Sequence, residues 1–255
     1  MISQKRLEEL RRELIKAQAD IAEQLRTEKS RKRADLNRKL HELRRMITPA
    51  YAFMSQAGQD AVVDRYFNHM EGGTFIDVGG YDGVTGSNTV FLEKWRNWNG
   101  IIVEPVTANL IRAEKARRCP CLGVAVAADE GTAEFITVTE GFTQMSGLSA
   151  SYDPGVLKKV RANPRHKEDT IEVKTKSLAA ILNEAKITHP DFVSLDIEGG
   201  ELAVLKAFPF AEHRVGVWAI ENNTGNRDIA DLMRRHNYDL IDFCGQDEIY
   251  AFRKT

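Results

Sequence analysis

Two clusters of acidic and amide side chains stand directly after apolar runs, where they could do chemistry. In "FVSLDIEGGE" the run delivers Asp196, with Glu198 and Glu201 close behind, and in "VGVWAIENN" it ends on Glu221 and Asn222. Carboxylates this close repel one another, so they need water, a cation or a shared proton. We expect Asp196 to be a general base or metal ligand, assisted by Glu221 and oriented by Glu198, and a hard cation such as Mg²⁺ would bind Asp196, Glu221 and Asn222. The structural alternative is that Asp196 caps a helix beginning near Glu201.

A glycine-rich turn follows an earlier apolar run, "TFIDVGGYDG". Gly79, Gly80 and Gly83 would let the backbone approach a ligand closely. Their spacing after Asp77 is D-x-G-G-x-x-G, which is not the dinucleotide fingerprint, and no phosphate-loop G-K-[ST] follows. A pyrophosphate binds helix N-termini and is repelled by acids. The acid-flanked turn therefore favours a cationic or neutral ligand.

A further carboxylate ends the next apolar run, "GIIVEP". Glu104 lies about 20 residues beyond the turn, where an acid can accept both hydroxyls of a ribose. S-adenosylmethionine fits this pattern, because its sulfonium and amino groups are positive and it has no phosphate. We expect this cofactor to bind in a shell made of Gln56, Asp77, Gly79, Gly80, Gly83, Asn88, Glu104 and Asp196.

Strands and helices alternate through most of the chain, which predicts an α/β fold with a mostly parallel sheet covered on both faces. At the C-terminus, "YDLIDFC" and "EIYAFRK" read as a hairpin that adds an antiparallel strand. We expect a Rossmann-like, seven-stranded sheet preceded by a long N-terminal helix. The candidate strands before the hairpin are "TFIDV", "GIIVEP", "LGVAVAA", "AEFITV", "IEVKT", "FVSLDI" and "VGVWAIE".

Two regions should be organised around this sheet, which we assign to residues 49–255. Residues 1–48 are expected to form a basic helical arm. An insert at about residues 139–170 is the least regular part of the body, so we expect it to cover the acceptor as a lid. His166 in this insert is an alternative general base, although a loop histidine is usually only solvated.

The arm differs from the body in charge and periodicity. Residues 1–46 hold 14 Lys and Arg against 8 Asp and Glu, whereas the rest holds 22 against 29. Leu7, Leu14 and Ile21 repeat at seven, a pattern that suits a coiled coil and predicts a homo-oligomer. The alternative is a helix that packs within the same chain. A membrane surface or an acidic partner is also compatible with the basic surplus, whereas the lack of aromatic residues in the arm argues against nucleic acid.

Composition sets broad limits on the protein. Hydrophobic residues make up 42% of the 255, and no apolar run approaches the roughly 18 residues that cross a bilayer. Three cysteines argue against a disulfide framework. We expect a cytoplasmic protein.

The motifs together resemble the FkbM-type family of class I S-adenosylmethionine-dependent methyltransferases, over roughly residues 54–253. The resemblance rests on "SQAGQD", "FIDVGGYDGVTGSNT", "GIIVEP", "AVAADEGTAEF", "SL", "FVSLDIEGGE" and "WAIE" in this order. It implies O-methylation, often of sugars or glycans. It also implies that Asp77, Gly79, Gly83 and Glu104 belong to the cofactor shell and that Asp196, Glu198 and Glu201 belong to a signature after the fourth strand. Gln59 stands where the family commonly has an acid, and the arm lies outside the family pattern.

Two other functions remain open at this point. A noncatalytic scaffold organised by the arm would keep the fold but not need Asp77, Glu104 and Asp196. A dinucleotide-dependent oxidoreductase is disfavoured by the glycine spacing.

Overall fold

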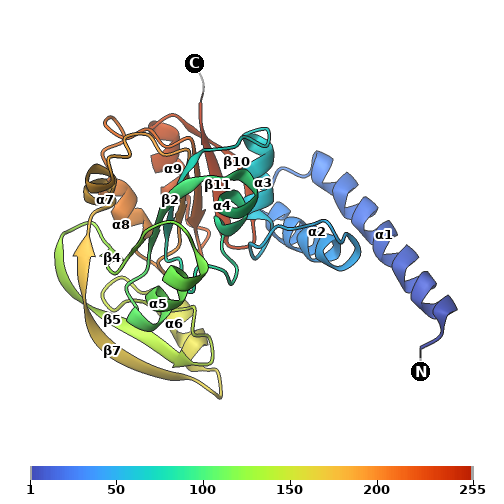
Figure 1. Cartoon of the computed structure of the whole chain (residues 1–255), viewed down its shortest axis with the longest axis horizontal. Coiled ribbons are helices and arrows are strands. Elements are labelled where there is room, and N and C mark those ends of the chain that lie inside the picture. Colours follow the sequence, from blue (N-terminus) through green and yellow to red (C-terminus); the bar gives the residue numbers. More distant parts are fainter. Residues whose placement is uncertain (1, 254–255) are drawn as a thin grey trace.

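The body is built on a seven-stranded sheet, seen in the computed structural model, which describes residues 2–253 (Figure 1). The strand order is β10-β11-β9-β8-β1-β2-β3. All neighbours are parallel except β11, which runs antiparallel to both β9 and β10. The expected α/β fold with an antiparallel C-terminal strand is therefore confirmed. The strands are β1 (Thr74–Val78), β2 (Asn99–Val103), β3 (Cys121–Leu122), β8 (Phe192–Leu195), β9 (Val217–Glu221), β10 (Tyr238–Cys244) and β11 (Asp247–Phe252).

Helices cover both faces of this sheet because alternate residues of each strand point to opposite sides. In β1, Ile76 packs toward α7, α8 and α9, whereas Phe75 packs toward α3 and α4. Fully buried strands explain why the sequence shows continuous apolar runs rather than alternation. The helices of the body are α3 (Gln59–Tyr66), α4 (Val90–Arg96), α5 (Thr107–Ala116), α6 (Pro154–Arg161), α7 (Leu178–Ala185), α8 (Glu201–Ala207) and α9 (Arg227–Arg235).

A second, four-stranded sheet lies beside the first and differs from expectation. Its order is β4-β7-β5-β6, with β4 (Ala125–Val126), β5 (Gly131–Glu140), β6 (Gly147–Leu148) and β7 (Lys167–Lys176). β5 and β7 pair antiparallel along their lengths and form the long ribbon at the lower left of Figure 1. The expected strand "LGVAVAA" is split at Gly123, so that β3 joins the large sheet and β4 the small one. The segment at 139–170 is also more regular than expected, since it holds β6, α6 and the ends of β5 and β7.

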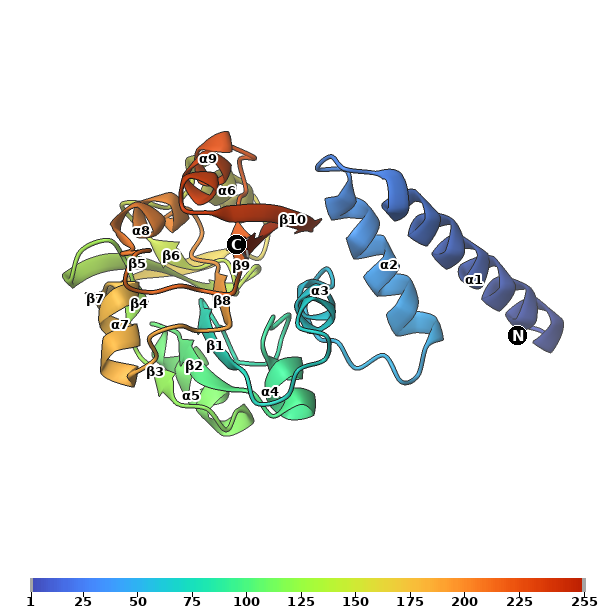
Figure 2. The same cartoon turned by 90° about the horizontal axis from the view of Figure 1, so that it is seen from above.

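The N-terminal arm is a pair of helices, α1 (Gln4–Thr27) and α2 (Arg33–Ile47). The chain turns between them at the charged gap in the apolar pattern. Figure 2 shows α2 lying between α1 and the body. α2 contacts β10 and buries Leu40 and His41, whereas α1 has no buried residue. α2 thus packs between the body and α1, so α1 is joined to the body mainly through α2.

Of the helices that the structure describes, none has the length and apolar character needed to cross a membrane.

Candidate active site

Two adjoining cavities lie at the carboxyl ends of β1, β2, β8 and β9. The apolar cavity has a volume of about 40 Å³ and is lined largely by Val103, Pro105, Val124, Phe135 and Leu148, with Glu104 and Asn109 at one side. The polar cavity has a volume of about 160 Å³, and Gln56, Gly86, Asn88 and Glu221 contribute to its wall. Both cavities are bounded by Val78, Gly79, Tyr81, Gln144, Asp196 and Glu198.

The charges around these cavities are all of one sign. The described residues that line them include the acids Asp77, Glu104, Asp196, Glu198 and Glu221, and include no Lys, Arg or His. Such a wall attracts a cation and repels a phosphate. This agrees with the electrostatic expectation from the sequence.

The turn after β1 needs glycine for the close approach of two strand ends. Gly79 has φ +79°, and a Cβ there would lie 1.9 Å from the backbone carbonyl oxygen of Asp196. A Cβ at Gly80 would lie 2.4 Å from a methyl group of Ile102. Gly83 is crowded by Arg117 and α5. The small residues here therefore let β1, β2 and β8 converge, in addition to leaving room for a ligand.

Asp77 is buried under this turn and is held by hydroxyl groups. Ser87 Oγ donates to its carboxylate at 3.1 Å, and Thr89 Oγ1 donates at 2.5 Å. Burial raises the pKa of Asp77, although the nearby Arg117 opposes this shift. Asp77 thus supports the turn and also reaches the wall of the polar cavity.

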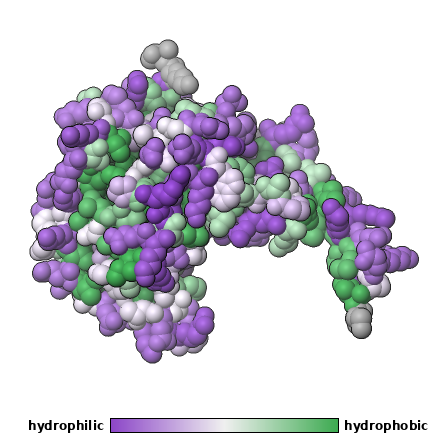
Figure 3. Space-filling model, in the orientation of Figure 1, coloured by the Kyte–Doolittle hydropathy of each residue, from purple (hydrophilic) through white to green (hydrophobic). Residues whose placement is uncertain are grey.

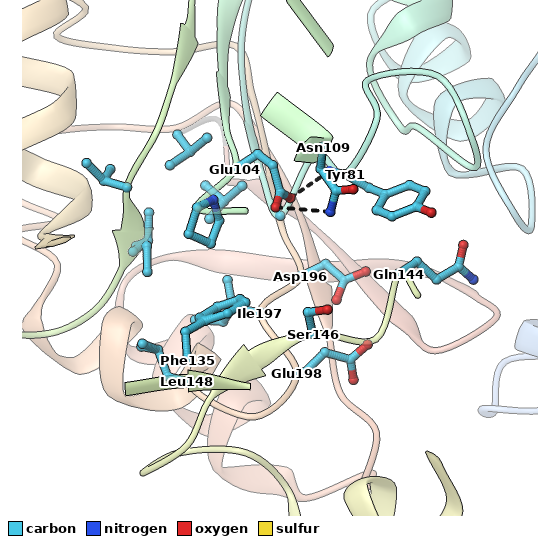
Figure 4. A pocket seen from close by; sticks show the side chains of 17 residues that line it. Tyr81, Glu104, Asn109, Phe135, Gln144, Ser146, Leu148, Asp196, Ile197 and Glu198 are labelled. Carbon is cyan, nitrogen blue, oxygen red and sulfur yellow. Dashed lines mark hydrogen bonds between the residues drawn. The ribbon is translucent and has the colours of Figure 1, made fainter. Parts of the chain in front are cut away.

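Glu104 points into the apolar cavity from the end of β2 (Figure 4). Its Oε2 accepts the backbone N–H of Tyr81 at 3.0 Å, and its Oε1 accepts the N–H of Val106 at 2.9 Å and a weaker bond from Asn109 Nδ2. Burial raises the pKa of Glu104 to about 7. These bonds fix the carboxylate between the turn after β1 and the start of α5, so its remaining lone pairs can accept the hydroxyls of a bound ribose.

Three carboxylates meet at the boundary of the two cavities. Asp196, Glu198 and Glu221 each offer an oxygen within 4.8 Å of the others. Glu221 is 7% exposed, and its Oε2 is buried without a hydrogen-bond partner in the described structure. Carboxylate oxygens are the ligands that Mg²⁺ and Ca²⁺ prefer. The donor set therefore fits a hard divalent cation or a shared proton.

Burial and mutual repulsion raise the pKa values of these carboxyls, whereas a bound cation would favour their ionised form. The pKa of Asp196 is raised to about 8 by burial, then by the charges of Asp247 and Glu201. The pKa of Glu198 is raised to about 9 by burial and by Asp196, and burial and the charge of Asp196 also raise the pKa of Glu221 well above its usual value. Titration in this range suits an acid or base at neutral pH.

A strained turn brings Glu198 into this group. Glu198 has φ +62°, which an amino acid with a side chain rarely adopts, and Gly199 follows with φ +130°. Glu201, the first residue of α8, accepts the backbone N–H groups of Ile197 at 3.0 Å and Gly199 at 3.1 Å. Glu201 is therefore the structural brace of the turn, and it does not line either cavity.

The chain at 142–148 closes the cavities from the side of the second sheet. Gln144 lines both cavities, while Met145 lines the polar one and Ser146 the apolar one. Tyr81 holds this segment, because its hydroxyl lies 2.7 Å from Thr143 Oγ1. Of residues 139–170, where we expect a lid, only this short stretch lines the two cavities.

The structure brings together most of the residues expected at the site. Gln56 and Asn88 line the polar cavity. Asn88 also donates to Ser194 Oγ at 2.9 Å, which fixes its side chain. Gln59, where the resembling family commonly has an acid, donates to the buried carboxylate of Asp247 at 2.9 Å. A second acid at that position would repel Asp247.

Two residues expected at the site do not lie beside the carboxylates of Asp196, Glu198 and Glu221. Asn222 donates to the carbonyl of Asn226 at 2.9 Å and to Glu248 at 3.0 Å, so its side chain points away and does not line the cavities. His166 lies 2.8 Å from Glu168 and is likewise absent from both walls.

Sequence reasoning missed other residues of the polar cavity. Asn223 lies there in place of Asn222, and Gln144 and Gln246 also line the wall. The alternation of a strand continued past its end would have pointed Asn223, and not Asn222, to the side of Glu221. The chain carries no comparable signal for Gln144 and Gln246, which lie in loops.

Residues 77–240, more than half of the chain, match the family described as the methyltransferase FkbM domain. No curated protein matches the sequence significantly.

Three solved structures are similar to this chain. A methyltransferase FkbM from Methylobacillus flagellatus is 14% identical with a TM-score of 0.43, and the match covers 93% of this chain but 58% of that one. A TehB-like S-adenosylmethionine-dependent methyltransferase from Corynebacterium glutamicum is 10% identical with a TM-score of 0.41, covering 83% and 95% of the two chains. A precorrin-6y C5,15-methyltransferase from Geobacter metallireducens is 12% identical with a TM-score of 0.41, covering 80% and 92%.

Proposed function

Because the chain belongs to the FkbM family of methyltransferases, we propose that it transfers a methyl group from S-adenosylmethionine to a hydroxyl of a sugar, a glycan or a sugar-containing metabolite. The observation that carries this proposal is the wall of the two cavities, which contains five acids and no basic residue among the described residues. A sulfonium cofactor without phosphate suits that wall.

Each cavity takes one part of the cofactor in this proposal. Glu104 accepts the ribose hydroxyls, and the apolar residues around Phe135 and Leu148 enclose the adenine. Gln56, Asn88 and the glycine turn border the polar cavity, which takes the amino-acid end and the acceptor. The methyl group would then lie beside Asp196, at the boundary of the two cavities.

The carboxylates of Asp196, Glu198 and Glu221 activate the acceptor hydroxyl. An alcohol is a poor nucleophile while protonated, so its proton must pass to a base, or its pKa must be lowered by a metal ion. Asp196 takes the proton directly, or Asp196, Glu198 and Glu221 hold a divalent cation that would supply Lewis-acid chemistry. Holding the hydroxyl about 3 Å from the methyl carbon in line with the sulfonium supplies much of the acceleration.

An acceptor assay tests the transfer to oxygen. The protein is incubated with methyl-deuterated S-adenosylmethionine, with Mg²⁺ or with a chelator, and with a panel of amine-free sugars and glycans. We expect a product whose mass rises by one labelled methyl group and which survives the mild base that hydrolyses methyl esters. Asp196→Asn should abolish turnover while binding S-adenosylhomocysteine normally, and exposed Glu212→Gln is the matched control. Labelling confined to amine or carboxylate acceptors would overturn the assignment to hydroxyl groups.

A noncatalytic scaffold organised by the arm remains the second candidate. The observation that favours this candidate is the projecting α1, which has no buried residue. The match covers only 58% of the FkbM structure from Methylobacillus flagellatus, so the acceptor and partners of this chain are part of the proposal. A purified protein that binds neither S-adenosylhomocysteine nor S-adenosylmethionine would favour the scaffold.

A further inference from the structure

A third cavity lies outside the site described above, where the arm meets the body. It has a volume of about 260 Å³ and is bounded by α1, α2 and α3. We call it the arm pocket. It shares no lining residue with the apolar and polar cavities. Residues 56–58 lie between them, because Gln56 lines the polar cavity whereas Ala57 and Gly58 line the arm pocket.

The arm pocket has the opposite electrostatic character to the other two cavities. Arg26, Arg33, Arg44 and Arg65 line it, and no Asp or Glu does so among the described residues. Arg33 is paired with Asp242 at 2.8 Å, and Arg26 makes only an exposed contact with Glu23. Within the described chain, no carboxylate forms an ion pair with Arg44 or Arg65. Two guanidinium groups are therefore left without a neutralising charge.

A buried, neutral histidine forms part of the wall of this pocket. His41 is 2% exposed and lines the arm pocket, and its Nδ1 lies 2.9 Å from the hydroxyl of Tyr51. Burial, followed by the charge of Arg45, lowers the pKa of His41 to about 4, while burial raises the pKa of Tyr51 to about 12. The imidazole is thus neutral and the phenol protonated at physiological pH.

The second ring nitrogen of His41 is the unpartnered atom. When the Tyr51 hydroxyl donates to Nδ1, the single ring proton lies on Nε2. Nε2 is buried and has no hydrogen-bond partner in the described structure, although the backbone of Ser55 is close enough to oppose the pKa shift. His41 is therefore a neutral part of the pocket wall, and the guanidinium groups carry the charge of the pocket.

We propose that the arm pocket binds a phosphate group, held by the guanidinium groups of Arg44 and Arg65. Arginine forks match the geometry of phosphate oxygens and make the strongest hydrogen bonds to them. α1 contributes Ala22, Leu25 and Arg26 to the wall of the arm pocket, so a bound anion would lie between α1 and the body. The inference does not depend on methyl transfer.

Titration of the full-length protein with inorganic pyrophosphate, and flotation with vesicles, test the proposal and identify the source of the phosphate. Vesicles of phosphatidylcholine with phosphatidic acid are compared with vesicles of phosphatidylcholine alone. Binding of pyrophosphate without flotation indicates a soluble phosphorylated ligand. Flotation that requires phosphatidic acid indicates a lipid headgroup. Binding of neither probe would overturn the proposal.

Matched variants separate this pocket from general charge effects. Arg44→Gln with Arg65→Gln should weaken binding by about tenfold or more for whichever probe, pyrophosphate or phosphatidic acid, binds the wild-type protein. Arg11→Gln with Arg12→Gln removes the same charge from exposed positions of the arm outside the pocket and should leave the affinity nearly unchanged. Equal losses in both double variants would refute a built site, and an unchanged affinity for S-adenosylhomocysteine in all variants would show that the methyl-donor site is intact.

Discussion

Glu198 combines a rare backbone conformation with a buried carboxylate, and both features cost stability. Its φ of +62° is of the kind that persists only where the surrounding structure enforces it. The hydrogen bonds from the backbone N–H groups of Ile197 and Gly199 to the Glu201 carboxylate hold the turn in this conformation. The result is a carboxylate directed at Asp196 and Glu221, where a cation or an acceptor proton would be bound.

The raised pKa values predict that the protein loses stability as pH rises above the ordinary carboxyl range. The unfolded state loses these protons near pH 4, whereas the folded state keeps them up to about 7 at Glu104, 8 at Asp196 and 9 at Glu198. Between these limits the native state binds more protons, so rising pH favours unfolding. Urea titrations from about pH 5 to pH 9 should show a falling free energy of unfolding, and Glu221→Gln should reduce the slope. A free energy that rises with pH through this window would contradict the account.

Divalent cations should reverse this loss of stability at high pH if Asp196, Glu198 and Glu221 form a metal site. Mg²⁺ added near pH 8 would replace the shared protons and bind the native state preferentially, which raises the melting temperature. Glu221→Gln should abolish the increase, whereas exposed Glu212→Gln should keep it. Calorimetry that shows no cation-dependent shift in the wild-type protein would leave proton transfer to Asp196 as the mechanism.

At the residue scale, the sequence could predict the acids but not their partners. Asp196 and Glu221 were expected together because neighbouring parallel strands end at one edge of a sheet. The proposed metal set was wrong in placing Asn222 beside them, because residues after a strand alternate in direction and the turn brings Glu198 instead. A left-handed conformation at a glutamate has no sequence signal of its own.

At the scale of elements, a buried ion pair holds the glycine turn in place. Arg117 is paired with Glu93 at 2.7 Å with both side chains almost fully buried. Arg117 also donates to the carbonyl of Gly83 and to Thr89, which in turn binds Asp77. The pair thus links α4 and the end of α5 to the turn that follows β1.

Breaking this pair should strongly destabilise the fold. Arg117→Leu would leave the carboxylate of Glu93 buried without a partner, which costs about 3–5 kcal/mol. Adding Glu93→Leu should recover much of the loss, because the uncompensated charge is then removed. Exposed Lys115→Leu on the same helix is the control. Urea denaturation in which the double variant is no more stable than Arg117→Leu would refute this explanation.

The pattern of apolar residues predicted the elements of the large sheet more reliably than those of the small one. Continuous apolar runs such as "FVSL" mark strands that are covered on both faces. β5 and β7 instead carry many exposed polar residues, as expected of an antiparallel pair with a solvated face. Their pairing across β6 and α6 depends on long-range contacts, which periodicity does not encode.

The whole molecule is a basic arm attached to an acidic body by complementary charges. Arg31 is paired with Glu248 at 2.6 Å, and Arg33 with Asp242. Both acids lie on the C-terminal hairpin, so the first and last parts of the chain are joined. The charge asymmetry was visible in the sequence, but these individual partners could be identified only in the structure.

The projecting helix α1 is the surface on which we propose that two copies of the chain associate. Leu7 is 47% exposed and Ile15 50% exposed, and Figure 3 shows hydrophobic residues along the side of the arm that faces the body. Deleting residues 1–29 should keep the body folded, because α2 and its contacts remain, and should lower the mass measured by light scattering to that of a monomer. An identical oligomeric state for the full-length and shortened proteins would rule out assembly through α1.

Calorimetric titration with S-adenosylhomocysteine and, separately, with NAD tests the central claim most directly. The acid-lined cavities predict that S-adenosylhomocysteine binds and that NAD, which carries a pyrophosphate, does not. Glu104→Gln, which weakens the acceptor of the ribose hydroxyls, should reduce the affinity for S-adenosylhomocysteine, and Glu212→Gln should not. Binding of NAD, or of neither molecule, would contradict the assignment of this site to a methyl donor.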